Sequence, residues 1–549
     1  MSKNISELSG RKGLDKNLFE ELGKAAATQG TPDAESLERI RNEFLVGKST
    51  VYGAVSFYDF LKPENRGKKV YVCNGSACMC AGTQNEIKNQ LSKHFKDNEI
   101  GEMCCLGRCH ENAAFWYNGK NYSGQDFTQL EKIISGQGKG REYYHVGHSG
   151  TPVLTKDYSE PLSHYKVLRK ALFTSTDNLL EELKVSGLRG RGGAGFPIAF
   201  KLDSCRNEKA TQRFIVCNAD EGDPGAFSDR YIMEQRPHSL LMGMIIAGYI
   251  AGASRGVVYI RGEYPESIDI IIDAINWLRS ENLLGENILG SGFDFDLKVI
   301  KAQGAYICGE ETALLSSIEG QRPEVRIRPP FPTQQGLFNK PTVVNNVETL
   351  ANLPYIVDNG GASYASIGTA KSTGTKLISL DSHFNRPGIY EVDMGTPLSV
   401  VVNELGQGFR TGVKAMHIGG PLGGLVPVEK INDLSIDFDS FAREGFLLGH
   451  ASVICIPNDF PIVKYIAHLF RFTAHESCGK CFPCRLGSTR GAELLEKAID
   501  GQYRIDKELF DDLITTMEMG SLCALGGGLP LPVRNALKYF ESELKQFFQ

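Results

Sequence analysis

The amino-acid sequence predicts a multidomain protein built from mixed α/β and α+β units. Its 549 residues are enough for several domains. In the middle of the chain, apolar runs of strand length alternate with helical runs around a glycine-rich stretch, which is typical of an α/β sheet. On either side of this region stands a group of four cysteines at metal-ligand spacings. We therefore expect a central ligand-binding α/β unit between two metal-binding units.

The composition argues against several classes of protein. A net charge of -5 without a run of lysine or arginine gives no indication of nucleic-acid binding. The longest apolar run, residues 240–253, is too short to cross a membrane and contains glycine, so it predicts a buried helix. The N-terminus lacks the apolar segment of a signal peptide, and fourteen cysteines in such a chain argue against a disulfide framework. We expect a soluble cytoplasmic protein.

The N-terminal part predicts helices followed by a small α+β unit. Apolar residues recur at three- and four-residue steps up to residue 60, which indicates helices. After them, residues 69–73 predict a strand and residues 82–95 an amphipathic helix. A β-rich run then contains the hairpin turn Tyr117-Asn-Gly-Lys120.

This small unit carries four cysteines in two closely spaced pairs, Cys73 with Cys78 and Cys105 with Cys109. By spacing alone, four thiolates in two such pairs fit a [2Fe-2S] cluster or a zinc ion equally well. The neighbouring Cys80 and Cys104 are expected to be small buried side chains without a metal.

The stretch after this unit predicts a linker, because it is rich in glycine and polar residues. Its two histidines, His145 and His148, stand three residues apart. We expect both to be solvated rather than to bind a metal.

Glycines and basic residues crowd the stretch from Ser186 to Lys201. A glycine cluster packs nothing, so we expect the backbone to approach a ligand there, with N–H groups facing phosphate. The spacing fits neither the dinucleotide fingerprint nor the P-loop. From the pattern alone, a flexible glycine loop stays the alternative.

The expected sheet places acidic residues beside this loop. Strand-like runs at 214–217 and 256–260 alternate with helical runs at 234–252 and 265–282. Directly after the first strand comes Asn218–Gly225, which contains three acidic side chains. Unpaired buried carboxylates are costly, so these side chains either bind a ligand or begin a helix.

The C-terminal part predicts a β-leaning region and then a helical unit. Glycine-rich strand patterns run to about residue 437. In the helical unit, Cys478, Cys481 and Cys484 stand three residues apart and Cys523 follows at a distance. This arrangement favours a [4Fe-4S] cluster, since zinc sites usually use two pairs. The remaining thiols, Cys205, Cys217, Cys308 and Cys455, are expected to be buried and unligated.

Read whole, several strings are similar to those of a known family. They are Gly-Leu-Arg-Gly-Arg-Gly-Gly-Ala-Gly-Phe-Pro at 187–197, Gly-Ala-Tyr-Ile-Cys-Gly-Glu-Glu-Thr at 304–312, and Pro-Thr-Val-Val-Asn-Asn-Val-Glu-Thr-Leu at 341–350. They resemble the FMN- and NADH-binding flavoprotein subunit of respiratory complex I and of NAD-linked, partly electron-bifurcating, hydrogenases and formate dehydrogenases. The strings around Cys73 and Cys105 resemble thioredoxin-like [2Fe-2S] ferredoxins, here fused to the flavoprotein part.

The resemblance covers nearly the whole chain and implies six segments. They are an N-terminal helical segment (1–65), a thioredoxin-like [2Fe-2S] domain (66–135), a linker (136–164), an FMN- and NAD-binding α/β domain (165–355), a β-grasp domain of the SLBB type (356–438) and a helical [4Fe-4S] domain (439–549).

The resemblance also implies the roles of individual residues. The residues implied to bind FMN and the nucleotide are Gly190, Arg191, Gly192, Gly193, Phe196, Lys201, Asn218, Asp220, Glu221, Asp223, Tyr306, Gly309, Glu310, Glu311, Val344, Asn345, Asn346 and Thr349. Glu221, Glu310 and Glu311 are implied to be catalytic. The implied ligands of the [2Fe-2S] cluster are Cys73, Cys78, Cys105 and Cys109, and those of the [4Fe-4S] cluster are Cys478, Cys481, Cys484 and Cys523.

The chain departs from the family pattern at two places near the nucleotide. Leu202-Asp-Ser204 stands where relatives carry Trp-Ser-Phe, so one stacking aromatic is missing. Asp223 stands where complex I proteins usually have glutamate. Glu311 is kept, and a carboxylate near the ribose would repel a 2′-phosphate, so NADH is expected rather than NADPH.

The implied function is an NAD(H)-linked oxidoreductase (diaphorase) subunit of a soluble multi-subunit redox complex. A nicotinamide delivers two electrons as hydride and iron–sulfur clusters carry single electrons, so FMN is the converter between them. Expected partners are NADH or NAD and other redox subunits, such as those of a hydrogenase or formate dehydrogenase, without nucleic acid or membrane insertion. The alternatives are a non-catalytic electron-conduit or assembly subunit, an NADPH-specific version and a zinc-binding scaffold.

Overall fold

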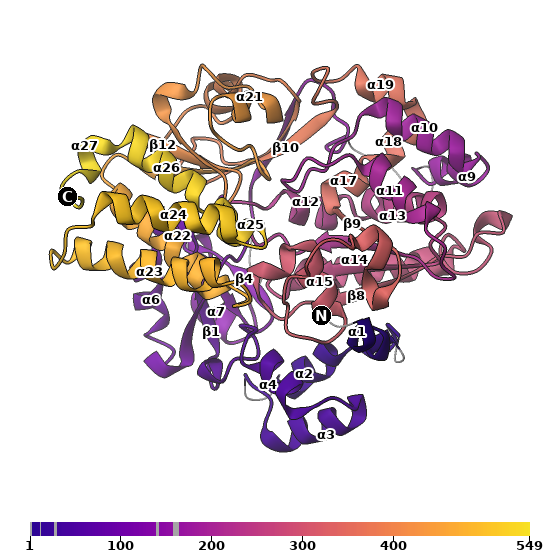
Figure 1. The fold of residues 1–549 in the computed structure, drawn as a ribbon, viewed down its shortest axis with the longest axis horizontal. Helices are drawn as coiled ribbons and strands as arrows, with labels where there is room; N and C mark the ends of the chain where they lie inside the picture. Colours follow the sequence, from indigo (N-terminus) through magenta and orange to yellow (C-terminus); the bar gives the residue numbers. More distant parts are fainter. Residues whose placement is uncertain (1–2, 11–12, 27–29, 139–141, 157–163) are drawn as a thin grey trace.

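The computed structural model describes residues 3–10, 13–26, 30–138, 142–156 and 164–549. These residues contain three β-sheets, with strand orders β2-β1-β3-β4, β8-β7-β6-β9 and β13-β12-β14-β10-β11-β5. In Figure 1 the C-terminal helices lie beside the first sheet, and the strands labelled β10 and β12 lie above both. The predicted fold class, a multidomain mixture of α/β and α+β units, is confirmed.

The N-terminal helices pack on the central unit through aromatic residues. The helices are α1 (Lys3–Gly10), α2 (Leu18–Ala26), α3 (Ala34–Phe44) and α4 (Lys48–Val55). Phe19 packs edge-on against Tyr58 with ring centres 4.7 Å apart. The Tyr58 hydroxyl donates to Ser317 Oγ of the central unit at 2.9 Å. This contact fixes the helical segment on the α/β unit.

The first sheet belongs to the thioredoxin-like unit. Its strands are β1 (Val70–Cys73), β2 (Ile100–Met103), β3 (Phe115–Tyr117) and β4 (Lys120–Tyr122), and its helices are α5 (Ser76–Cys80), α6 (Gln84–Leu91) and α7 (Leu130–Ile134). The predicted hairpin turn is present, with Asn118 at φ 47° and Gly119 at φ 74°. Asparagine and glycine tolerate these left-handed angles, which explains the turn.

The central sheet is entirely parallel and covered by helices, as the βα rhythm predicted. Its strands are β6 (Phe214–Ala219), β7 (Arg255–Ile260), β8 (Asp296–Lys301) and β9 (Thr342–Asn346). The helices of this unit are α9 (Lys166–Leu172), α10 (Thr176–Ser186), α11 (Ile198–Asn207), α12 (Ser228–Gln235), α13 (Pro237–Ala251), α14 (Pro265–Ser280), α15 (Glu311–Ile318), α16 (Pro332–Gln335), α17 (Val347–Ala351), α18 (Leu353–Asn359) and α19 (Gly361–Ala365). Helix α13 is buried along nearly all its length, which confirms the predicted buried helix.

The third sheet has the strand order of a β-grasp fold. Its strands β10 (Thr375–Leu380), β11 (Gly388–Asp393), β12 (Val413–Ile418), β13 (Gly424–Pro427) and β14 (Ser452–Pro457) are accompanied by helices α20 (Leu398–Val400) and α21 (Phe438–Arg443). The first and last of these strands, β10 and β14, are parallel neighbours at the centre. The sheet therefore needs β14, and the expected boundary at residue 438 is too early, because a central strand lies beyond it.

The predicted linker contributes a strand to this sheet. Strand β5 (His145–Ser149) pairs in parallel with β11 along its whole length. His148 is exposed, as expected, whereas His145 is half-buried. The polar sequence of β5 has no hydrophobic alternation, so only the free edge of β11 makes it a strand.

Glu391 on β11 holds the segment that follows β5. Its carboxylate accepts from the backbone N–H groups of Val153, Leu154 and Thr155 at 2.8–3.0 Å and from the hydroxyls of Thr155 and Thr375 at 2.8 and 2.6 Å. We expect Glu391→Gln to reduce the stability of this unit by about 2 kcal/mol, because the amide loses charge and one acceptor oxygen. The measurement is the urea midpoint of the variant, with the exposed Glu429→Gln as control; equal midpoints in the two variants would contradict this role.

The C-terminal unit is a helical bundle packed against the other units. It contains α22 (Ile462–Glu476), α23 (Phe482–Ile499), α24 (Lys507–Gly520), α25 (Ala524–Gly528), α26 (Pro530–Tyr539) and α27 (Glu541–Leu544). One continuous apolar core contains side chains of the bundle, the thioredoxin-like unit and the α/β unit. In the described parts of the chain, no helix has the length and apolar character that crossing a membrane requires.

Candidate cofactor and iron–sulfur sites

The candidate cofactor site lies at the carboxyl ends of the central strands. Strand β6 leads into Asn218 and Asp220, and the neighbouring β9 ends at Asn346, which is paired with Asn218 in register. Ligands of open parallel sheets bind at this edge. The glycine loop lies against it, because a Cβ placed on Gly192 would stand 2.8 Å from Asn346 Cβ.

Backbone and side-chain bonds close the glycine loop at its base. The N–H of Gly190 donates to the carbonyl of Phe196 at 2.9 Å, and Arg189 Nε donates to the carbonyl of Gly195 at 2.8 Å. Gly193 and Gly195 have φ values of 118° and 61°, which glycine adopts without strain. The loop is therefore a defined turn whose backbone can come close to a ligand.

Three buried polar atoms at this edge have no hydrogen-bond partner among the described residues. They are Asp220 Oδ2, Asp229 Oδ1 and Asn345 Nδ2. Buried polar groups are normally satisfied, so unpaired atoms beside a glycine loop indicate a missing polar ligand. Two acceptors and one donor fit the hydroxyl groups of a ribityl chain, and the residues present therefore fit FMN.

A group of charged side chains extends from this edge along α11 and α15. Lys201 Nζ lies 3.0 Å from Glu311 Oε2 and donates to the carbonyl of Val344 at 3.1 Å. Arg328 pairs with Glu310 and lies 3.2 Å from Glu311 Oε1. Glu310 caps α15 by accepting two backbone N–H groups at 2.8 and 2.9 Å. Lys201, Glu311 and Arg328 stay partly exposed and can reach a nucleotide.

Glu221 was expected to be catalytic, but the structure places it inside the protein. It is 4% exposed, and its carboxylate caps α12 by accepting the N–H groups of Asp229 at 2.9 Å and Arg230 at 3.1 Å. Burial, and then the charge of Asp229, raise the pKa of Glu221 to about 7. The geometry favours a positioning role for Glu221, because its oxygens already serve the helix.

Arg191 differs from expectation in a similar way. Its side chain is fully buried and donates to the hydroxyl of Tyr364 at 3.1 Å and to the carbonyl of Thr373. Its backbone N–H donates to Thr349 Oγ1 at 2.8 Å. A ligand cannot reach a guanidinium without exposure, so the Arg191 side chain anchors the glycine loop, and Thr349, also fully buried, supports it from below.

The remaining expected residues lie around the same edge. Phe196 is exposed, and its ring is 5.4 Å from that of Phe200. Asn218 Nδ2 donates to the carbonyl of Gly309 at 2.8 Å, which ties β6 to the 3-10 turn η5 (Tyr306–Gly309). The hydroxyl of Tyr306 donates to Asp223 Oδ1 at 2.7 Å. The two loops that begin after β6 and β8 are thus bonded to each other.

The first cysteine quartet comes together in the thioredoxin-like unit. Cys73, Cys78, Cys105 and Cys109 are all at most 2% exposed, and the sulfurs of Cys105 and Cys109 are 3.3 Å apart. Backbone N–H groups of Gly75, Gly107 and Gly225 donate to three of these sulfurs at 3.5, 3.4 and 3.2 Å. Hydrogen bonds to the sulfurs tune the reduction potential of iron–sulfur clusters. Gly225 belongs to the loop after β6, so it connects this quartet with the cofactor edge.

The second quartet lies at the N-terminus of α23. Cys481 is the N-cap of α23, Cys484 lies in its first turn and Cys523 is the N-cap of α25. The free N–H groups and the dipole of α23 favour negative charge at this end. Burial raises the pKa of the Cys523 thiol to about 12, and the charges of Glu310, Cys478 and Cys484 add to this. Cys523 therefore lies close to both its own quartet and the cofactor side.

The spread of the thiols favours clusters over zinc. Four sulfurs bound to one zinc ion lie about 3.8 Å from one another. Among the described residues, no three cysteine sulfurs lie within 4.8 Å of one another. A cluster separates its ligands by several atoms and fits this spacing. The expected unligated cysteines are buried, namely Cys80, Cys205, Cys217, Cys308 and Cys455, while Cys104 is half-buried.

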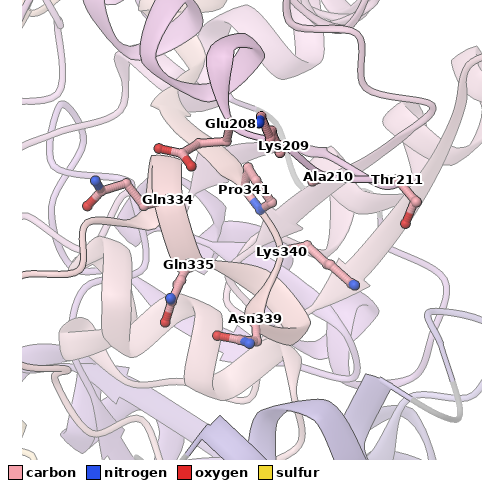
Figure 2. A pocket seen from close by; sticks show the side chains of 9 residues that line it. All are labelled: Glu208, Lys209, Ala210, Thr211, Gln334, Gln335, Asn339, Lys340 and Pro341. Carbon is pink, nitrogen blue, oxygen red and sulfur yellow. The ribbon is translucent and has the colours of Figure 1, made fainter.

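A surface pocket of about 510 Å³ lies at the opposite edge of the central sheet. It is lined by Glu208–Thr211, which lead into β6, and by Asn339–Pro341, which lead into β9, together with Gln334 and Gln335. Figure 2 shows the labelled side chains pointing in different directions rather than converging on one point. This is the amino edge of the strands, away from the glycine loop, so the pocket is not the cofactor site.

Sequence reasoning missed two charged residues of the site. Arg261 directly follows β7, is 2% exposed and pairs with Glu263 at 3.0 Å. Its charge opposes the effect of burial on the pKa of Asp220, which is raised. Glu476 accepts from the N–H of Tyr306 at 2.8 Å. The position of Arg261 after a predicted strand was a usable signal, whereas nothing in the sequence indicates the contact of Glu476.

Three family descriptions match the chain. The Nuo51 FMN-binding domain matches residues 183–355, which contain the glycine loop and all four central strands. The thioredoxin-like [2Fe-2S] ferredoxin matches residues 6–137, and the NADH-ubiquinone oxidoreductase-F iron–sulfur binding region matches residues 464–547. These two regions contain the two quartets. The predicted FMN, [2Fe-2S] and [4Fe-4S] cofactors are thereby confirmed.

Known proteins are similar to most of the chain. It is 43% identical over 385 residues to the NADP-reducing hydrogenase subunit HndC of Solidesulfovibrio fructosivorans, covering 70% of this chain and 78% of the relative. It is 41% identical over 406 residues to the F 2 subunit of the NADH-quinone oxidoreductase of Rhizobium meliloti, covering 71% and 96%. The crystal structure of an air-oxidized NAD+-reducing [NiFe]-hydrogenase superposes with a TM-score of 0.85 at 28% identity, covering 98% of this chain and 95% of that chain.

The regions of similarity are those that carry the described sites. The FMN-binding match ends after β9, and the iron–sulfur match spans α23 and Cys523. The solved structure extends the similarity to the thioredoxin-like unit and the β-grasp sheet. With the predicted family, fold class and oxidoreductase class confirmed, this chain belongs to the family of FMN-binding iron–sulfur F subunits of NADH-quinone oxidoreductases, with a thioredoxin-like [2Fe-2S] unit fused to it.

Proposed function

We propose that this chain is the NAD(H)-linked flavoprotein (diaphorase) subunit of a multi-subunit redox complex. One observation carries the proposal: the 2.7 Å bond between Asp223 and Tyr306 joins two loops, each of which touches a different cysteine quartet. The loop of Asp223 continues to Gly225, whose N–H donates to Cys109 Sγ at 3.2 Å. Tyr306 and Cys523 interact electrostatically. A cofactor held between these loops lies next to both cluster sites.

The chain's own residues bind and shield, while FMN supplies the redox chemistry. When bound, FMN takes up two electrons as a hydride and gives them up singly, which links a nicotinamide to iron–sulfur clusters. The glycine loop brings backbone close to the ligand, and Asp220 and Asn345 offer the unpaired polar atoms. The low exposure of the quartet around Cys73 excludes water from the sulfurs. No side chain has to act as an acid or a nucleophile.

The charged group along α11 supports NADH as the nucleotide. The proposed nucleotide contacts are Phe196, Lys201 and Glu311, because they are exposed beside the glycine loop. A carboxylate at the ribose favours hydroxyl groups over a 2′-phosphate. NADPH is the second candidate, because Arg328 beside Glu311 is a partly exposed cation that a 2′-phosphate can use.

The surface near the [4Fe-4S] site supports docking of another redox subunit. Phe482 and Leu522, the neighbours of ligands Cys481 and Cys523, are exposed, and so is Met519. Apolar side chains beside a cluster are suited to a protein partner that accepts or delivers electrons. We propose a hydrogenase, formate dehydrogenase or related subunit as that partner and the cytoplasm as the location.

An anaerobic titration tests the function. Purified protein is titrated separately with NADH and NADPH, while flavin absorbance and low-temperature EPR are recorded. We expect NADH to bleach the flavin and to produce the signals of two clusters, and Arg328→Gln to weaken NADPH binding about tenfold while leaving NADH binding within a factor of two. If neither nucleotide bleaches a flavin that is demonstrably bound, the chain is an electron conduit with an altered nucleotide site.

A further inference from the structure

A buried histidine of the β-grasp unit lies behind the candidate flavin site. His450 stands two residues before β14 and is 5% exposed. Its Nε2 lies 3.2 Å from Asp229 Oδ2 and 3.8 Å from Glu221 Oε1, and its Nδ1 lies 3.5 Å from Ser228 Oγ. The imidazole of one unit therefore contacts the N-terminus of α12 in another.

The contacts of His450 lead directly to predicted flavin ligands. Asp229 Oδ2, which faces the imidazole, also accepts from Asn346 Nδ2 at 2.5 Å. A Cβ placed on Gly193 would stand 4.0 Å from the backbone nitrogen of His450. His450 thus supports both the glycine loop and the asparagine that faces it.

The charges around the site require a cation at this position. Asp220, Glu221 and Asp229 are buried within one short segment, and the phosphate of FMN would add further negative charge. Buried like charges are costly unless a cation is close. Burial alone would keep His450 neutral, but the charges of Asp229 and Glu221 outweigh it and raise the pKa of His450 to about 9.

We propose that His450 is a positioning residue of the flavin site, which in its protonated form holds Asp229 and, through it, Asn346 in the geometry that binds FMN. The inference rests on the proposed function, since it assumes that FMN binds at the glycine loop. A metal ion is the competing use of Glu221, Asp229 and His450, whose ligand atoms lie within 4.8 Å of one another. The carboxylates already accept N–H groups and the Asn346 amide, which favours a hydrogen-bonded cation over a metal.

The proposal predicts how FMN binding depends on pH. The groups that face His450 are Asp229 on α12, Glu221 and Asp223 in the loop after β6, and Lys376 on β10, which opposes its charge. The contribution of the imidazolium is complete below the ordinary histidine pKa and is lost as the pH rises through about 9. FMN affinity is therefore expected to fall between pH 8 and 10.

Two histidine variants test the proposal in the full chain with both clusters present. His450→Gln keeps a hydrogen-bond donor without the charge. We expect it to raise the Kd for FMN about tenfold at pH 7, the effect of losing one hydrogen bond to a charged group, and to flatten the pH dependence. His417→Gln is the matched control, because His417 is buried in the same unit but bonds to Tyr465 at 2.8 Å, away from the glycine loop. Its FMN affinity should equal that of the wild type.

The readout is quenching of FMN fluorescence on addition of FMN-free protein from pH 7 to 10. Wild-type affinity and pH profile in His450→Gln would overturn the proposal, and so would a bound metal ion that this variant loses. If both variants fail to fold, the wild type decides, since an affinity that is constant from pH 7 to 10 overturns the proposal. If the wild type binds no FMN at any pH, the proposed function itself fails, which distinguishes the two.

Discussion

Replacing Cys481 with alanine is expected to abolish the EPR signal of the [4Fe-4S] cluster while FMN and the [2Fe-2S] cluster stay bound. Cys481 is the N-cap of α23 and is half-exposed, so its loss opens the cluster to water and removes one of four ligands. The FMN contacts proposed at β6 and β9 share no hydrogen bond with Cys481. The measurement combines iron and acid-labile sulfide content, released FMN and EPR spectra after reduction.

A second cysteine provides the matched control. Cys205 on α11 is fully buried in the apolar core, and Cys205→Ala removes one sulfur without touching either quartet. This variant should keep both cluster signals and its FMN, with only a small loss of stability. A [4Fe-4S] signal that persists in Cys481→Ala would refute the ligand assignment, and its absence in Cys205→Ala would show that the loss is not specific.

Much of the fold was predictable because local patterns agree with the final structure. The strands β6 and β7 are apolar runs with a helix after each, and such runs form parallel sheets wherever they meet. The turn at Asn118-Gly119 needs only residues that accept left-handed angles. The spacing of the cysteines likewise reflects the geometry of clusters, so both quartets were found from sequence.

The parts that sequence reasoning missed depend on contacts between distant segments. Strand β5 exists because β11 offers a free edge, not because His145–Ser149 favours a strand. Central strand β14 follows the expected domain boundary, since a β-grasp sheet closes with its last strand. No local pattern distinguishes such pairings from loops.

The side chains of the site show the same limit. Sequence identifies Glu221 and Arg191 as chemically suitable, but their direction is set by α12 and by Tyr364, to which they bond. Their buried positions follow from tertiary packing, which overrides what a polar residue in a loop suggests. His450 had no signal at all, because its partner Asp229 is more than two hundred residues away in the chain.

Substituting valine for Gly192 is expected to reduce bound FMN to a few per cent of the wild-type content or less. A Cβ at this position would stand 2.8 Å from Asn346 Cβ and 3.2 Å from its Cγ, and valine adds two methyl groups to it. Either the loop moves away from β9, or Asn346 turns and loses its 2.5 Å bond to Asp229. Both changes separate the backbone of the loop from the polar groups that would hold the ligand.

Acid release of FMN, followed by absorbance, measures the effect, with Gly190→Ala as the control. Gly190 lies in the same loop, but its Cβ would find its nearest neighbour at 3.4 Å, so this variant should keep most of its FMN. Because the cysteines lie outside the loop, both cluster signals should remain in Gly192→Val and show that the chain is folded. Normal FMN content in a folded Gly192→Val protein would mean that the flavin does not lie between the glycine loop and Asn346, and the site would then have to be sought elsewhere along the carboxyl edge of the sheet.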